Sequence, residues 1–132
     1  MAPELLNIKE TCLYVRDLEA TRKFYETVMG LQPIHYKTGR HLFFRIGSDV
    51  LLFFNAEATS TDEGLPRHFG SGEQHIAFEC NSEDYERWKR YLLQNGVSIE
   101  QEVEWPKGGK SFYFRDPDNL CLEIVERGIW GF

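Results

Sequence analysis

The chain has 132 residues, 42% hydrophobic and 27% charged, a composition typical of a single folded domain and not of a disordered chain. Its 15 basic and 21 acidic side chains give a formal net charge of −6, which argues against a nucleic-acid partner because such proteins usually carry a basic patch. No apolar run approaches the roughly 20 residues of a membrane-spanning helix, and the first residues do not resemble a signal peptide. We therefore expect a cytoplasmic protein with reduced cysteines and no membrane partner.

The first half of the chain predicts a strand, a helix and three further strands. Residues 11–16 alternate and are rich in strand formers. Asp17 stands where a helix N-cap is expected, and Gly30 stands where that helix should end. The strand-like runs that follow cover about 31–37, 41–47 and 49–55.

The second half repeats this order. A long connecting loop at 56–73 precedes it. This half predicts a strand at 74–80 and a helix capped by Ser82 and closed by Gly96. The remaining strand-like runs cover about 97–104, 111–115 and 119–126. We therefore predict one α+β domain over residues 1–132, built from two βαβββ modules at about 8–55 and 74–126.

Alternation along the strands divides their side chains between a helix-covered face and an opposite face. The opposite face is expected to carry Glu10, His75 and Glu123 at corresponding places of the two modules, with Leu51 as the approximate counterpart of Glu123. Two carboxylates and one imidazole can bind a divalent Fe, Mn, Ni, Co or Zn ion and leave positions open for water or substrate. The side chains expected to pack under the helices are Leu13, Val15, Ile76, Phe78, Leu122 and Ile124.

Three further residues are candidates for substrate contact. Tyr113 shares the face of Glu123 and can donate a proton or hydrogen bond to a bound oxyanion, although a tyrosine packed in an aromatic sheet is an equal alternative. Arg45 has the opposite parity to its apolar neighbours and suits a carboxylate or phosphate, the alternative being an exposed strand edge. Phe53 is expected to contact the substrate with them.

The other histidines have weaker claims to a function. His68 lies in the connecting loop, where it would either close over a substrate or stay solvated. His35 and His41 are expected at the surface or at strand edges.

Four segments, at 13–25, 29–31, 75–78 and 111–124, together resemble the vicinal oxygen chelate superfamily. That superfamily contains glyoxalase I, methylmalonyl-CoA epimerase, extradiol ring-cleaving dioxygenases, and fosfomycin- and bleomycin-resistance proteins. The resemblance implies a U-shaped, barrel-like mixed sheet around a divalent metal, and a homodimer. By position it places the metal ligands at Glu10, His75 and Glu123, with Leu51 at the fourth ligand position.

The chain departs from the family pattern in two ways. Glu10 stands where His or Gln is common, and Leu51 stands where glyoxalase I usually has Glu. The run 110–114 resembles the fosfomycin-resistance pattern, but the basic residue expected near the C-terminus is missing.

The resemblance implies a metal-dependent enzyme of the lyase or isomerase type. It would chelate two neighbouring oxygens of a small molecule, stabilise an enediolate-like anion and move a proton with Glu10 or Glu123. The alternatives are an Fe(II) ring-cleaving dioxygenase and a metal-free protein that binds small molecules or drugs.

Overall fold

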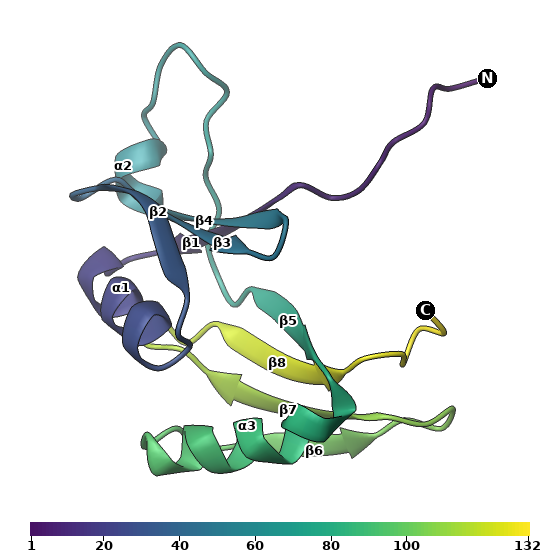
Figure 1. Ribbon diagram of the computed structural model, residues 1–132. Coiled ribbons are helices and arrows are strands. Elements are labelled where there is room, and N and C mark those ends of the chain that lie inside the picture. The colour runs from purple at the N-terminus through teal and green to yellow at the C-terminus, as the bar shows by residue number, and fades with distance from the viewer. The chain divides into compact units, whose positions relative to one another are not determined.

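The computed structural model describes every residue from Met1 to Phe132, and the chain divides into two compact units, Met1–Gly72 and Glu73–Phe132. Each unit contains one strand, one helix and three more strands in the same order along the chain, and the first unit has a second, short helix after them (Figure 1). The helices are all too short or too polar to cross a membrane.

The first unit is a mixed four-stranded sheet with the strand order β1-β4-β3-β2. The strands β1 and β4 run parallel, whereas β3 is antiparallel to both of its neighbours. The elements of this unit are β1 (Glu10–Val15), α1 (Leu18–Thr27), β2 (Gln32–Lys37), β3 (His41–Ile46), β4 (Asp49–Asn55) and the short helix α2 (Ala56–Thr59).

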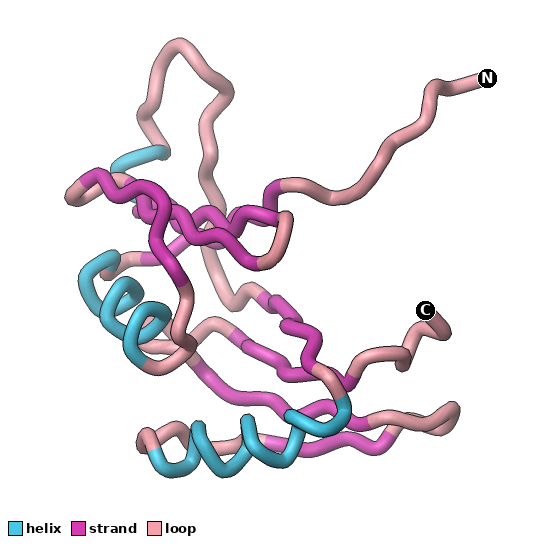
Figure 2. The backbone as a smooth tube through the Cα atoms, viewed as in Figure 1, coloured by secondary structure: helices cyan, strands magenta, loops and turns pink.

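The second unit repeats the topology with the strand order β5-β8-β7-β6 (Figure 2). The strands β5 and β8 run parallel, and β7 is antiparallel to β8 and β6. Its elements are β5 (His75–Cys80), α3 (Ser82–Gln94), β6 (Gln101–Glu104), β7 (Lys110–Arg115) and β8 (Cys121–Glu126).

Local sequence explains where the helices begin and end. The side chain of Asp17 accepts a hydrogen bond from the Ala20 amide at 3.0 Å, and Gly30 ends the α1 segment at a φ of 70°, which favours glycine. The cap of α3 is Asn81, because Ser82, which we expected to be the cap, is already the first helical residue. The helix α2 lies in a segment predicted as loop; the Asn55 side chain caps it.

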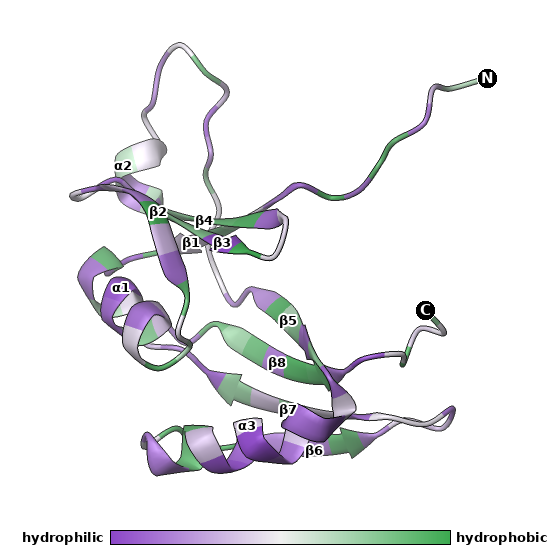
Figure 3. Ribbon diagram, in the orientation of Figure 1, coloured by the Kyte–Doolittle hydropathy of each residue, from purple (hydrophilic) through white to green (hydrophobic).

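Aromatic and aliphatic side chains fill a separate core under each helix. In the first unit the Tyr25 ring of α1 lies 4.6 Å from Phe53 and 6.0 Å from Phe44, between ring centroids. In the second unit Tyr85 of α3 lies 5.4 Å from Phe112. Figure 3 shows α3 largely in hydrophilic colours, and the buried residues of this helix are Tyr85 and Leu92. Each sheet therefore has one helix-covered face and one face without a helix, called the open face below.

The predicted fold class is confirmed as α+β with two βαβββ modules. The eight strands form two separate four-stranded sheets and are not closed into a barrel. Of the side chains expected under the helices, Leu13, Val15, Leu122 and Ile124 are buried, whereas Ile76 and Phe78 of β5 are only half-buried.

Candidate metal centre

The two parallel strand pairs define which positions of the two units correspond. Cys12 lies opposite Leu52 in the first unit, and Ala77 lies opposite Glu123 in the second. The counterpart of Glu123 is therefore Leu52, not Leu51 as the sequence suggested. Leu51 has the parity of the helix-covered face and is 2% exposed. The correction leaves an apolar residue at the fourth position, so this position supplies no fourth ligand.

His75 is the first residue of β5, and its ring is fixed by the neighbouring strand. Its Nδ1 lies 2.9 Å from the backbone carbonyl oxygen of Cys121, the residue opposite it in the parallel register. A carbonyl oxygen only accepts hydrogen bonds, so Nδ1 must carry the proton and donate it. In the neutral ring, Nε2 is then a bare lone pair. Metal-binding histidines commonly have this arrangement, with the second nitrogen donating to a carbonyl or carboxylate.

The lone pair of His75 faces the carboxylate of Glu123. The distance from His75 Nε2 to Glu123 Oε2 is 3.1 Å, and the Glu123 side chain is 8% exposed, against 49% for His75. Two acceptors at this distance repel each other unless a positive charge lies between them. A proton, which makes an imidazolium, or a metal cation would satisfy both groups. The donor set thus fits a divalent cation, because imidazole nitrogen and carboxylate oxygen are common ligands of Fe, Mn, Ni, Co and Zn.

Tyr113 completes this cluster in the second unit. It lies opposite Glu123 in the antiparallel pair of β7 and β8, and its ring centroid is 6.0 Å from that of His75. Burial, the negative charge of Glu123 and a hydrogen bond to Glu123 together raise the pKa of the Tyr113 hydroxyl. The hydroxyl therefore stays protonated and donates to the Glu123 carboxylate, which helps to hold the carboxylate in place.

Glu10 occupies in β1 the position that His75 occupies in β5. Each is the first residue of a strand paired in parallel with the last strand of its module. Glu10 is exposed, and its charge contributes, after burial, to raising the pKa of the Cys12 thiol on the same face of β1. Neither unit by itself gathers three His, Cys, Asp or Glu side chains that could hold a metal ion. The structure therefore brings His75, Tyr113 and Glu123 together within the second unit, whereas Glu10 belongs to the first unit.

The two other predicted substrate residues lie on different faces of the first sheet. Arg45 lies exposed on the open face of the first sheet, where its Nε donates to the Gly47 carbonyl at 2.7 Å. Phe53 is fully buried against Tyr25 under α1, so its assignment as a substrate residue is wrong. It is one of five consecutive apolar residues, and its neighbour Phe54 takes the open-face parity.

The sequence did not predict a histidine cluster on the open face of the first sheet. His41 is 7% exposed, not at the surface, and its Nε2 lies 2.7 Å from Nδ1 of His35. Arg40 Nη1 lies 2.5 Å from His41 Nδ1, and Arg40 Nη2 donates to Asp62 at 2.5 Å. The signal was available in the alternation of β3, because His41 has the parity of Phe43 and Arg45. The alternation could not indicate the contribution of the connecting segment, whose Asp62 accepts the hydrogen bond from Arg40.

The chain is similar to proteins of one family over nearly its whole length. The family model described as Glyoxalase/Bleomycin resistance protein/Dioxygenase superfamily matches residues 7–124.

A solved structure of lactoylglutathione lyase from Agrobacterium tumefaciens is 33% identical, with a TM-score of 0.91 over 96% of this chain and 97% of that chain. The metallothiol transferase FosB of Staphylococcus epidermidis is 28% identical over 92% of this chain and 82% of its own length. The fosfomycin resistance protein FosX of Listeria monocytogenes is 25% identical, with a TM-score of 0.68 over 98% of each chain.

Proposed function

Because the chain belongs to the Glyoxalase/Bleomycin resistance protein/Dioxygenase superfamily, we propose that it is a metal-dependent enzyme of the lyase or isomerase type. Its substrate would be a small molecule with two neighbouring oxygens, and its reaction a proton transfer next to a carbonyl group. The observation that carries the proposal is the pair of His75 and Glu123, whose two acceptor atoms face each other at 3.1 Å. The similarity to a lactoylglutathione lyase supports the reaction type.

The proposed metal ligands are Glu10, His75 and Glu123. A bound divalent ion would act as a Lewis acid toward the two substrate oxygens. Two carboxylates and a neutral imidazole contribute a charge of −2, so the ligand set balances a divalent cation. The metal could be Fe, Mn, Ni, Co or Zn, since all five accept oxygen and nitrogen ligands.

The two carboxylates differ in their freedom to move a proton. Glu123 is buried and held by His75 and Tyr113. Glu10 is exposed at the start of β1. Glu10 is therefore the better candidate for the base that takes the substrate proton, and Tyr113 for the group that donates a hydrogen bond to the resulting anion. Arg45 would contact an acidic group of the substrate from the open face of the first sheet.

The experiment combines metal analysis with hydrogen exchange. The purified protein is reconstituted with each of the five metals, and its metal content is measured after dialysis. It is then incubated in deuterated water with a panel of α-hydroxy ketones and with glutathione plus methylglyoxal. We expect stoichiometric metal uptake, deuterium incorporation next to the carbonyl in one class of substrate, and loss of both in His75→Ala.

The matched control is Glu79→Ala, which removes an exposed carboxylate from the same strand as His75 and should change neither result. Metal uptake by His75→Ala equal to that of the wild type would refute the ligand assignment. Stoichiometric metal without deuterium incorporation would favour another reaction. Oxygen consumption with catechols would indicate the ring-cleaving dioxygenase, and the absence of metal in every form would indicate a binding protein.

Thiol transfer is a second candidate, favoured by the match to a protein named metallothiol transferase over 92% of this chain. The same metal-loaded protein tests it, by measuring thiol consumption in the presence of fosfomycin with and without His75→Ala. A metal-dependent loss of thiol without deuterium incorporation would favour the transferase over the lyase.

We also propose that the protein is a cytoplasmic homodimer that binds small molecules and no nucleic acid.

A further inference from the structure

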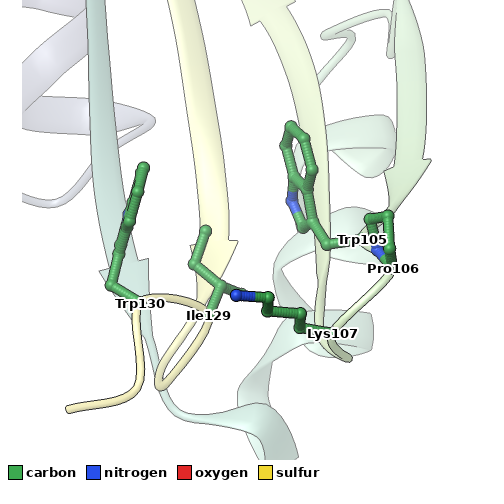
Figure 4. A pocket seen from close by; sticks show the side chains of 5 residues that line it. All are labelled: Trp105, Pro106, Lys107, Ile129 and Trp130. Carbon is green, nitrogen blue, oxygen red and sulfur yellow. The ribbon is translucent and has the colours of Figure 1, made fainter.

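A slot between two indole rings lies at one end of the second sheet (Figure 4). Trp105 and Pro106 line it from the turn after β6, and Ile129 and Trp130 from the segment after β8. The Lys107 side chain also lines it and places an ammonium group near Ile129 in Figure 4. Its surface is almost entirely apolar, and Trp130 is 81% exposed. An exposed tryptophan beside an apolar slot is typical of a protein interface.

The slot is held in shape by the backbone around it. The amide of Trp105 donates to the Gly109 carbonyl at 2.9 Å, and its indole Nε1 donates to Ser111 Oγ at 2.9 Å. Gly109 has a φ of 85°, and a Cβ atom there would lie 2.5 Å from Cγ2 of Ile129. A side chain at this position would therefore displace Ile129. The slot is thus a built feature, which lowers the ordering cost of filling it.

The first unit carries an apolar segment of a size that suits such a slot. Residues 1–9 belong to no helix or strand, and they run out from β1 as an extended tail (Figure 2). Leu5, Leu6 and Ile8 are 92%, 89% and 80% exposed. In an extended chain alternate side chains share one side, so Glu4, Leu6 and Ile8 point together and Leu5 points away. The tail therefore has one side with an acidic group followed by two apolar groups.

We propose that the tail of one copy of this chain binds in the slot of a second copy. Leu6 would lie between the indoles of Trp105 and Trp130, and the carboxylate of Glu4 would pair with the ammonium of Lys107. This charge complementarity selects the direction of the tail in the slot. In a two-fold symmetric dimer the contact occurs twice, once for each tail. The proposal uses none of the residues assigned to the metal.

The dissociation constant of the full-length dimer, measured by analytical ultracentrifugation, tests the contact. Leu6→Asp places a charge between the indoles and should raise the constant roughly tenfold or more. The matched control Leu5→Asp puts the same charge on the other side of the tail and should change it less than about twofold. Glu4→Lys and Lys107→Glu should each raise it about threefold, and the double variant should return toward the wild type.

Carbodiimide cross-linking identifies the chain that supplies the tail. Heavy- and light-isotope forms of the protein are mixed, allowed to exchange and treated with the reagent, which joins a carboxylate to an amine in direct contact. We expect Glu4–Lys107 cross-links that contain one heavy and one light peptide. Cross-links between peptides of the same isotope alone would mean that the tail binds its own chain, and the proposal would be wrong. Equal effects of Leu5→Asp and Leu6→Asp, or no effect of either, would also overturn it.

Discussion

The open faces of the two sheets have the same backbone register but carry different chemistry. Glu123 of the second sheet corresponds to Leu52 of the first, and Tyr113, which lies opposite Glu123, corresponds to Phe43, which lies opposite Leu52. The repeat thus supplies two equivalent backbone frames, the first frame being the first sheet and the second frame being the second sheet. Only the second holds a paired histidine and carboxylate, so the side chains and not the topology set the chemistry of each open face.

The comparison also shows how a buried carboxylate is accommodated. Glu123 and Leu52 are both 6% exposed. Leu52 needs no polar partner, whereas Glu123 has His75 and Tyr113 on its two sides. Burying a charge is costly unless it is paired and hydrogen-bonded, so the second sheet keeps these partners together. Exchanging the two residues between the frames therefore separates metal binding from stability.

The largest effect is expected when the second frame is made like the first. Glu123→Leu removes a proposed ligand and leaves His75 with its carbonyl contact. Metal affinity should fall by at least about 100-fold, because a ligand contributes more than an outer partner, whose loss costs about 10- to 100-fold. The fold should persist, since leucine fills the corresponding place in the first sheet. Calorimetric titration with the preferred metal measures the loss. Affinity within about threefold of the wild type would show that Glu123 is no ligand.

The reverse exchange is the second prediction. Leu52→Glu introduces a buried carboxylate opposite Phe43, which cannot donate a hydrogen bond. The free energy of unfolding in urea should fall by about 3 kcal/mol, the scale for a buried group without partners. The control Leu52→Met keeps the apolar character and should cost less than about 1.5 kcal/mol. Equal stability of the two variants would mean that the first frame also accommodates a charge.

Most of the fold could be predicted because it rests on local patterns. The helix stop at Gly30 and the alternation of β1 and β8 each depend on a few neighbouring residues. The assignments of Leu51 and Phe53 failed for one reason. The run 50–54 is apolar at both parities, so the sequence gives no sign of which side chains face α1. Pairing with β3 decides it, and pairing is not local. The same holds for His41, whose partner Arg40 also bonds Asp62, a residue more than twenty positions along the chain.

The third prediction concerns the corrected position of Phe53. Phe53→Leu should lower the free energy of unfolding by about 1.5 kcal/mol, because the smaller side chain leaves space beside Tyr25. Its KM for any substrate found should stay within about twofold of the wild type, since the ring lies under α1. Phe54→Leu, the matched change on the open face, tests the opposite face of the same strand. A large rise in KM for Phe53→Leu alone would restore it as a substrate residue.

The smallest effect concerns a histidine of the first frame and depends on pH. His41 corresponds to Ser111, so His41→Ser makes the two frames alike at this place. The guanidinium of Arg40 can only donate, so His41 Nδ1 accepts from it and Nε2–H donates to His35. A protonated His41 would place a hydrogen against Arg40. Burial first, then the charges of Arg40, His35 and Lys37, lower the pKa of His41 below its usual 6.5, and Asp62 opposes them.

Because the pKa of His41 is lowered in the folded protein, acidification should reduce the stability of the fold. At pH values just below 6.5 the unfolded chain binds a proton at residue 41 and the folded chain does not, so stability falls as the pH drops. Above 6.5 both states are neutral there, and this contribution is fully present. His41→Ser should cost about 1 kcal/mol at about pH 8 through lost packing, but it should lose less stability than the wild type on acidification to about pH 5. Urea unfolding at both values measures this. His68→Ser leaves the contact between Arg40 and His41 in place and should keep the steeper fall. Equal slopes for the wild type and His41→Ser would mean that the arginine contact does not hold His41 neutral.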